Sequence, residues 1–161
     1  MTTFRAKRVG YSHTIQLNET PDNVFPLFTP EGEKSWAAGW DFIPVFPDAE
    51  TEENMIFTTT AQDHGQVDAI WIMARYKPAA YMIEYQRIEP GIKIGRIRIR
   101  CEADEQTAKT LATIEYVYTA LSETGNTFVE GFTEHGYRQF IHAWSEAINF
   151  YLHTGKILNH S

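Results

Sequence analysis

A histidine in an alternating segment near the N-terminus is the side chain of this sequence best suited to acid–base chemistry. His13 lies between Tyr11 and Ile15 on the apolar face of that segment. Imidazole changes its charge near neutral pH, so in a cavity it could act as a general base or orient a ligand. His13 is therefore the best candidate for a catalytic group. A buried neutral histidine with one satisfied hydrogen bond is the structural alternative.

Tyrosines in two later segments share their side of the chain with apolar residues. Tyr81 and Tyr85 flank one isoleucine at the same parity, and Tyr116 and Tyr118 follow another. This parity predicts that the four rings face inward. Several phenols in one cavity would suit a ligand with hydroxyl or carbonyl groups, because a buried hydroxyl needs a hydrogen-bond partner. Packing with mutual hydrogen bonds explains the same pattern.

Large apolar side chains at inward positions complete the candidate ligand site. Trp71 is assigned inward although both sides of its segment are apolar, and Trp144 lies on the apolar stripe of the last helix. Aromatic and aliphatic side chains line most small-molecule pockets. The candidate ligand-binding residues are Tyr11, His13, Trp71, Tyr81, Tyr85, Ile99, Tyr116, Tyr118, Ile141 and Trp144.

The other reactive side chains form no recognisable site. His135 and His142 are two helical turns apart, about 10 Å, on the polar stripe of the last helix, so we expect no metal site. Cys101 has inward parity and no activating cation beside it, which indicates a small buried hydrophobic residue. The sequence contains no phosphate loop, nucleophile elbow or zinc-type cysteine spacing. We expect no cofactor.

Composition and charge exclude several classes of protein. Lys plus Arg number 14 and Asp plus Glu number 21, a net charge of −7, which argues against binding to nucleic acid. The longest apolar run, Ala69–Ala74, is far shorter than the roughly 18 residues of a membrane span. A single cysteine excludes an internal disulfide, and no signal-peptide pattern opens the chain. We therefore expect one cytoplasmic domain over residues 1–161.

Periodicity and turn residues divide the chain into one strand, two short helices, six strands and a long helix. Lys7–Asn18 alternates as a half-buried strand does. Prolines after capping threonines predict helices over Pro21–Phe28 and Pro30–Ala37. The last helix is predicted from a cap at Asn126 to Gly155, with a kink or a change of buried face in its first two turns. The other predicted strands are Asp41–Phe46, Asn54–Ala61, Val67–Tyr76, Ala80–Glu89, Ile92–Ala103 and Thr107–Leu121.

The short connections between these strands predict an antiparallel sheet. A sheet of about seven strands tends to curl, and the last helix is the one long enough to cover its concave face, so the fold class is α+β. In Ile92–Ala103 the apolar parity changes at Gly95, which predicts a bulge. The outer face would then carry charged residues that can pair across strands. These residues are Glu84, Arg96, Arg98, Arg100 and Glu115. Binding of an anionic ligand by the arginines is the alternative.

Three stretches of the sequence resemble the START-like, or SRPBCC, superfamily, which has the helix-grip fold of the birch-pollen allergen family. They are IQLNETPDNVF (15–25), TPEGEKSWAAGWD (29–41) and YTALSETGN (118–126). The middle stretch is most similar to bacterial members described as polyketide-cyclase-like. Its Trp36, Gly39, Trp40 and Asp41 match that subgroup, and we interpret them as structural residues that close one end of the pocket. The resemblance covers nearly the whole chain and carries over no catalytic residue.

The resemblance implies a curved seven-stranded sheet, two short helices after the first strand and a cavity under the long helix. Members of the superfamily bind lipids, sterols, polyketides or plant hormones in that cavity, and some are cyclases or hydratases. The leading hypothesis is therefore binding of a small hydrophobic or amphipathic molecule. The alternatives are a cyclase, aromatase or hydratase that uses His13 and the tyrosines, and a protein-interaction module. A homodimer is compatible with each of these functions.

Overall fold

The computed structural model describes residues 3–48, 50–60 and 68–159. Within these residues seven strands form one sheet in the order β1-β7-β6-β5-β4-β3-β2, and every neighbouring pair is antiparallel. In chain order the elements are β1 (Arg8–Leu17), α1 (Pro21–Val24), the 3₁₀ helix η1 (Phe25–Phe28), α2 (Pro30–Glu33), β2 (Ile43–Phe46), β3 (Ile56–Thr59), β4 (Ala69–Lys77), the 3₁₀ helix η2 (Pro78–Ala80), β5 (Met82–Glu89), β6 (Lys93–Ala103), β7 (Thr110–Ala120), α3 (Glu123–Gly131) and α4 (Glu134–Thr154).

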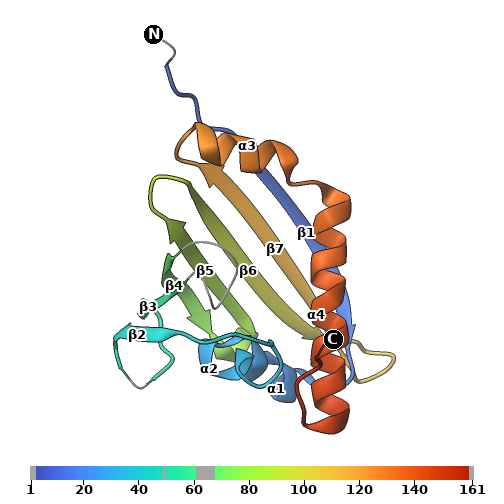
Figure 1. The fold of residues 1–161 in the computed structure, drawn as a ribbon. Coiled ribbons are helices and arrows are strands. Elements are labelled where there is room, and N and C mark those ends of the chain that lie inside the picture. Colours follow the sequence, from blue (N-terminus) through green and yellow to red (C-terminus); the bar gives the residue numbers. More distant parts are fainter. Residues whose placement is uncertain (1–2, 49, 61–67, 160–161) are drawn as a thin grey trace.

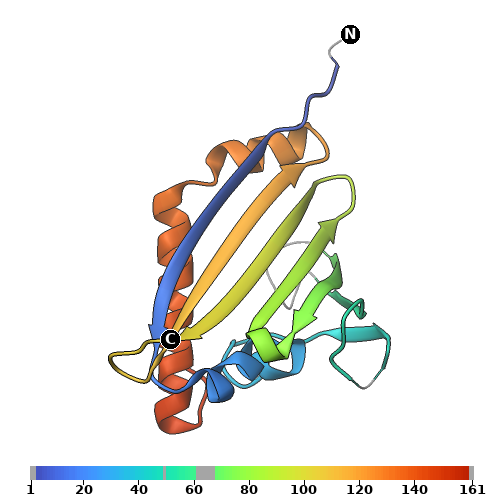
Figure 2. The same cartoon turned by 180° about the vertical axis from the view of Figure 1, so that it is seen from behind.

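The helices lie on one side of the curved sheet (Figure 1). α4 runs beside β1 and β7, α3 crosses one end of these strands, and α1 and α2 lie near the other end of the sheet. Seen from behind, the long strands β1, β7 and β6 carry no helix on the face turned to the viewer (Figure 2). The predicted α+β architecture, with an antiparallel sheet and a long C-terminal helix, is confirmed.

The C-terminal helical region is two helices rather than one kinked helix. α3 begins after Ser122, whose hydroxyl accepts a hydrogen bond from the Gly125 amide at 3.3 Å. α4 begins after Thr133, which caps Gly136 in the same way at 3.1 Å. The predicted cap at Asn126 is wrong. Its side chain instead bonds the backbone of residues 5 and 7, and thereby ties the start of the chain to α3.

The predicted bulge at Gly95 is also wrong. β6 pairs with β5 and β7 through Gly95 without a shift of register. Gly95 faces inward under the ring of Tyr118, where a Cβ would lie 2.9 Å from Cε1 of that ring, and Ile94 lies on the outer face. The change of apolar parity at Gly95 is therefore explained by the close contact of Gly95 with the Tyr118 ring. A register shift does occur in the pairing of β4 with β5, between Met73 and Arg75 of β4.

The predicted charge pairs on the outer face are confirmed. Arg98 donates from Nε to Glu84 at 2.9 Å, and Arg96 donates to Glu115 at 3.2 Å. On the opposite face, Tyr137, Ile141 and Ile148 of α4 are fully buried against the sheet. The concave face is therefore the apolar interior in which a ligand site has to lie.

Candidate functional site

All four tryptophans of the sequence line one small cavity on the concave face. Trp36 and Trp40 lie after α2, Trp71 lies on β4 and Trp144 lies on α4. The ring centroids of Trp36 and Trp144 are 5.7 Å apart, and those of Trp40 and Trp71 are 5.6 Å apart. The complete lining is Glu33, Trp36, Ala37, Trp40, Trp71, Tyr85, Ile97, Ile99, Tyr116 and Trp144. We call this space the tryptophan cavity.

The tryptophan cavity is small in this conformation. Its volume is about 50 Å³. One water molecule needs a cavity of about 10–15 Å³, so the space holds a few waters or a compact chemical group. Pockets for drug-sized ligands are roughly 300–1,000 Å³. A larger molecule therefore enters completely only if part of the wall moves.

The wall formed by residues 30–40 is held by short-range hydrogen bonds. Thr29 caps α2 by accepting from the Gly32 amide at 3.0 Å. Trp36 donates its indole N–H to the Leu27 carbonyl at 2.8 Å, and Trp40 donates to the Pro30 carbonyl at 2.8 Å. Each tryptophan thus has its indole nitrogen satisfied by a backbone carbonyl, and its ring is free to pack. The ring of Trp36 packs against Phe28 and Trp144, and the ring of Trp40 packs against Phe57 and Trp71 on the sheet.

Glu33 is the charged residue that sequence reasoning missed. It lies three, four and seven residues before Trp36, Ala37 and Trp40, which is the spacing of one helical face. Glu33 as a residue is only partly buried, yet its carboxyl group is surrounded by protein, and this desolvation raises its pKa well above the usual range. Within the described residues the carboxyl group has no hydrogen-bond or ion-pair partner.

Two tyrosines face Glu33 from the sheet. The Tyr85 hydroxyl donates to the Phe28 carbonyl at 2.6 Å. Tyr116 is 5% exposed, and in the described part of the chain its hydroxyl bonds to no protein group. Burial raises the pKa of both phenols, so both are neutral near pH 7. Tyr116 and Glu33 are therefore the two polar groups of the cavity that a ligand can engage.

A buried ionic network borders the cavity behind Trp71. Glu89 accepts hydrogen bonds from both Arg87 and Lys93, and the three side chains are less than one-tenth exposed. The Arg87 guanidinium lies 5.5 Å from the ring centroid of Trp71, and its Nε has no partner among the described residues. None of these three side chains is among the residues that line the cavity.

The structure brings half of the sequence-based candidates to this cavity. The candidates that line it are Trp71, Tyr85, Ile99, Tyr116 and Trp144. Four others lie outside the cavity: Ile141 belongs to the core, and Tyr11, Tyr81 and Tyr118 are partly buried and pack against it. Tyr11 donates to the Phe132 carbonyl at 3.1 Å, Tyr118 packs 4.9 Å from the ring of Phe132, and Ile141 is fully buried under α4. Tyr81 precedes β5 and turns to α1, where its hydroxyl bonds Asp22 at 2.5 Å.

His13 lies outside the tryptophan cavity. β1 is the edge strand next to α4, so an inward position on β1 borders the side of the helix instead of the interior. The imidazole lines an open surface groove of α4 and β1, together with His135, Arg138, Gln139 and His142. The described residues contain no group of three or more His, Cys, Asp or Glu that could hold a metal ion.

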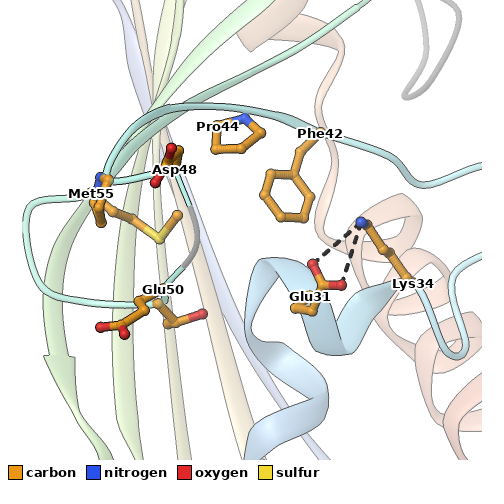
Figure 3. A pocket seen from close by; sticks show the side chains of 9 residues that line it. Glu31, Lys34, Phe42, Pro44, Asp48, Glu50 and Met55 are labelled. Carbon is orange, nitrogen blue, oxygen red and sulfur yellow. Dashed lines mark hydrogen bonds and ion pairs between the residues drawn. The ribbon is translucent and has the colours of Figure 1, made fainter.

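A second pocket lies on the other side of α2 (Figure 3). It measures about 220 Å³ and lies between α2 and the segment around β2. Lys34 pairs with Glu31 at 3.3 Å and lies over the ring of Phe42, 4.8 Å from its centroid. Glu31 and Lys34 are largely exposed and paired with each other. This pocket is therefore a surface feature lined by both charged and apolar side chains, whereas Glu33 faces the apolar interior.

No helix in the described parts of the chain combines the length and hydrophobicity needed to cross a bilayer. No protein-family model matches the sequence, and no curated protein matches it significantly. Similarity is found with solved structures.

Norcoclaurine synthase from Thalictrum flavum superposes with a TM-score of 0.64 at 12% identity, covering 92% of this chain and 88% of that one. Mll3558 from Rhizobium loti gives 0.64 at 13%, covering 89% and 99%. Ara h 8.0201 gives 0.63 at 11%, covering 91% and 98%. These identities are too low to transfer an activity, but the superpositions extend over nearly the whole chain. The chain therefore shares the helix-grip fold of these structures, which is the fold that the three sequence stretches predicted.

Proposed function

We propose that this protein binds a small organic molecule with an apolar or aromatic part in the tryptophan cavity. The observation that carries the proposal is the convergence of all four tryptophans on one space that also contains two polar groups, Glu33 and Tyr116, for which the described residues provide no hydrogen-bond partner. Apolar walls with a few converging polar groups are typical of ligand sites. A core built only for stability would fill this space and pair the carboxyl group.

The size of the cavity sets a condition on this function. Because about 50 Å³ is too little for a whole drug-sized molecule, a ligand of that size requires the segment with Trp36 and Trp40 to move outward. Glu33, Ala37 and Trp144 are partly exposed, so the cavity opens to the surface between α2 and α4. We therefore expect hydrogen exchange in residues 34–42 to change when a ligand binds.

Thermal-shift screening of small aromatic and amphipathic compounds tests the proposal. A compound that binds the cavity raises the melting temperature of the natural protein. Ala37→Leu fills the cavity and should abolish the shift, whereas Ala38→Leu, at an exposed neighbour outside the lining, should preserve it. The proposal fails if no compound stabilises the natural protein, or if a stabilising compound acts equally on both variants.

The raised pKa of Glu33 favours acid–base catalysis in the same cavity as a second function. A protonated carboxyl group can donate a proton to a carbonyl oxygen of a bound substrate, and the Tyr116 hydroxyl can hold that oxygen. Under this hypothesis the acid–base group is Glu33, and not His13 as the sequence predicted. Turnover of a polyketone or enone substrate that is lost in Glu33→Gln and retained in His13→Ala would support it. Loss in His13→Ala alone would contradict it.

A further inference from the structure

The charge balance of the tryptophan cavity is unusual for a site that takes neutral apolar ligands. Glu33 is the one charged residue among the ten that line it, and within the described chain neither a cation nor a hydrogen-bond donor satisfies its carboxylate. An ionised carboxylate in an apolar space is unstable unless it has a counter-charge. Without a counter-charge the Glu33 carboxyl group is therefore more stable in its protonated form. A ligand with a positive charge could take the place of that proton.

The aromatic walls of this cavity favour a positive charge as well. Trp36, Trp40, Trp71 and Trp144 lie around the space together with the phenol rings of Tyr85 and Tyr116. The faces of such rings attract cations electrostatically, tryptophan most strongly, and cages of aromatic residues recognise ammonium groups in this way. A small cavity suits a compact cationic headgroup, and the remainder of the ligand can extend through the opening between α2 and α4.

We infer that the ligand of the tryptophan cavity carries an amine or quaternary ammonium group, which pairs with the Glu33 carboxylate inside the aromatic cage. This inference rests on the proposed ligand-binding function and narrows it to organic cations. On binding, the cation replaces the proton of Glu33, so the cavity remains neutral overall. The Tyr116 hydroxyl would hydrogen-bond a polar group next to the cationic centre.

One charge on the protein opposes this arrangement. The Arg87 guanidinium lies 5.5 Å from the ring centroid of Trp71 and also acts on the Tyr116 phenol. The network of Arg87, Glu89 and Lys93 has one more positive than negative charge. If this positive charge acted on the cavity more strongly than the Glu33 carboxylate, the cavity would prefer an anion. The test therefore compares ligands of the same shape and different charge.

Three probes make that comparison: choline, its uncharged isostere 3,3-dimethylbutan-1-ol (tert-butylethanol), and the anion 3,3-dimethylbutanoate. Intrinsic fluorescence reports on the site directly, because every tryptophan of the sequence lines the cavity. We expect choline to bind at least about tenfold more tightly than the alcohol, and the anion to bind most weakly. Equal binding of choline and the alcohol, or tighter binding of the anion, overturns the inference and leaves the proposed function standing. If none of the three probes and no aromatic compound binds, both fail.

Two matched variants assign the effect to one carboxyl group. Glu33→Gln should weaken choline binding by about tenfold or more and change binding of tert-butylethanol by less than about twofold. Glu31→Gln removes a carboxylate two residues away that is exposed and paired with Lys34, and should leave both affinities unchanged. An equal loss of choline affinity in both variants would mean that surface charge attracts the cation, and would overturn the inference.

The pH dependence supplies a readout that a purely structural Glu33 would not change. Choline has a fixed charge, so its affinity should rise about tenfold per pH unit up to the pKa of Glu33 and then level off. The phenols that face Glu33 do not titrate in this range, because burial keeps Tyr85 and Tyr116 neutral. The nearest cation outside the lining, the guanidinium of Arg87 beside Trp71, is a fixed charge. In Glu33→Gln the dependence should disappear. A dependence that persists in Glu33→Gln contradicts the inference.

Discussion

At the residue scale, Glu33 and Glu53 have pKa values that depart from the usual carboxyl range in opposite directions. The pKa of Glu53 is lowered, first by its hydrogen bond from Lys77, whereas desolvation raises that of Glu33. A raised folded-state pKa means that the folded protein binds a proton that the unfolded chain releases. The stability from this proton is fully present below about pH 4.5, the unfolded value, and is lost as pH rises through the folded pKa.

Replacing Glu33 by Gln should therefore change the pH dependence of folding. We expect the free energy of unfolding of Glu33→Gln, relative to the natural protein, to increase with pH above about 4.5. The slope should be at most about 1.4 kcal/mol per pH unit, and less because the residue is partly exposed. Urea unfolding between pH 4 and 8 measures this difference, with Glu31→Gln as the control that should show no such trend. A constant difference between Glu33→Gln and the natural protein would show that Glu33 titrates normally.

Cys101 illustrates a residue whose role was predicted correctly from parity alone. It is 3% exposed, and burial raises the pKa of its thiol to about 12. Thiolate is the reactive form, so we expect no measurable reaction with a disulfide reagent at pH 8 in the folded protein and full reaction in urea. Rapid reaction of the folded protein would contradict the burial of this strand position.

At the element scale, the contact between α2 and η1 sets the position of Glu33 and Trp36. A Cβ at Gly32 would lie 1.9 Å from the Pro26 carbonyl oxygen and 2.8 Å from the Leu27 Cα, and neither backbone atom can move freely. Gly32→Ala should therefore cost roughly 1–3 kcal/mol in the free energy of unfolding. It should also weaken ligand binding, because α2 carries one wall of the cavity.

Gly131 provides the control for that substitution. It ends α3, and a Cβ there would meet no atom within 4 Å. Gly131→Ala should leave stability unchanged or raise it slightly, because alanine reduces the freedom of the unfolded chain. Equal stability of the two variants in urea unfolding would mean that the close contact of α2 with η1 does not constrain the fold.

Most elements could be predicted from the sequence, because strand alternation and threonine–proline helix starts are local signals. The errors arose where a long-range contact decides. Gly95 is small because Tyr118 packs on it, and Asn126 bonds the N-terminal segment instead of capping a helix. The predicted helix Pro30–Ala37 is α2 followed by turns, in which the Ala37 amide still bonds the Glu33 carbonyl at 2.9 Å.

At the scale of the whole molecule, the fold could be predicted but the location of the site only in part. Parity shows which residues of a strand face inward, but it does not show which part of the concave face α4 fills. α4 covers the side of the concave face next to β1. Ile141 is therefore buried in the contact between α4 and the sheet, and His13 lies at the edge of that contact. The open space lies nearer β4 and β5. The sequence did contain a signal for Glu33, since it shares a helical face with Trp36 and Trp40.

The most direct test of a ligand site in the tryptophan cavity is fluorine NMR of protein labelled with fluorotryptophan. The sequence has four tryptophans, so the spectrum should contain four resonances. We predict that a compound which stabilises the protein shifts all four, and that Ala37→Leu suppresses these shifts. A stabilising compound that leaves the four resonances in place would show that the ligand binds elsewhere, and would contradict the account.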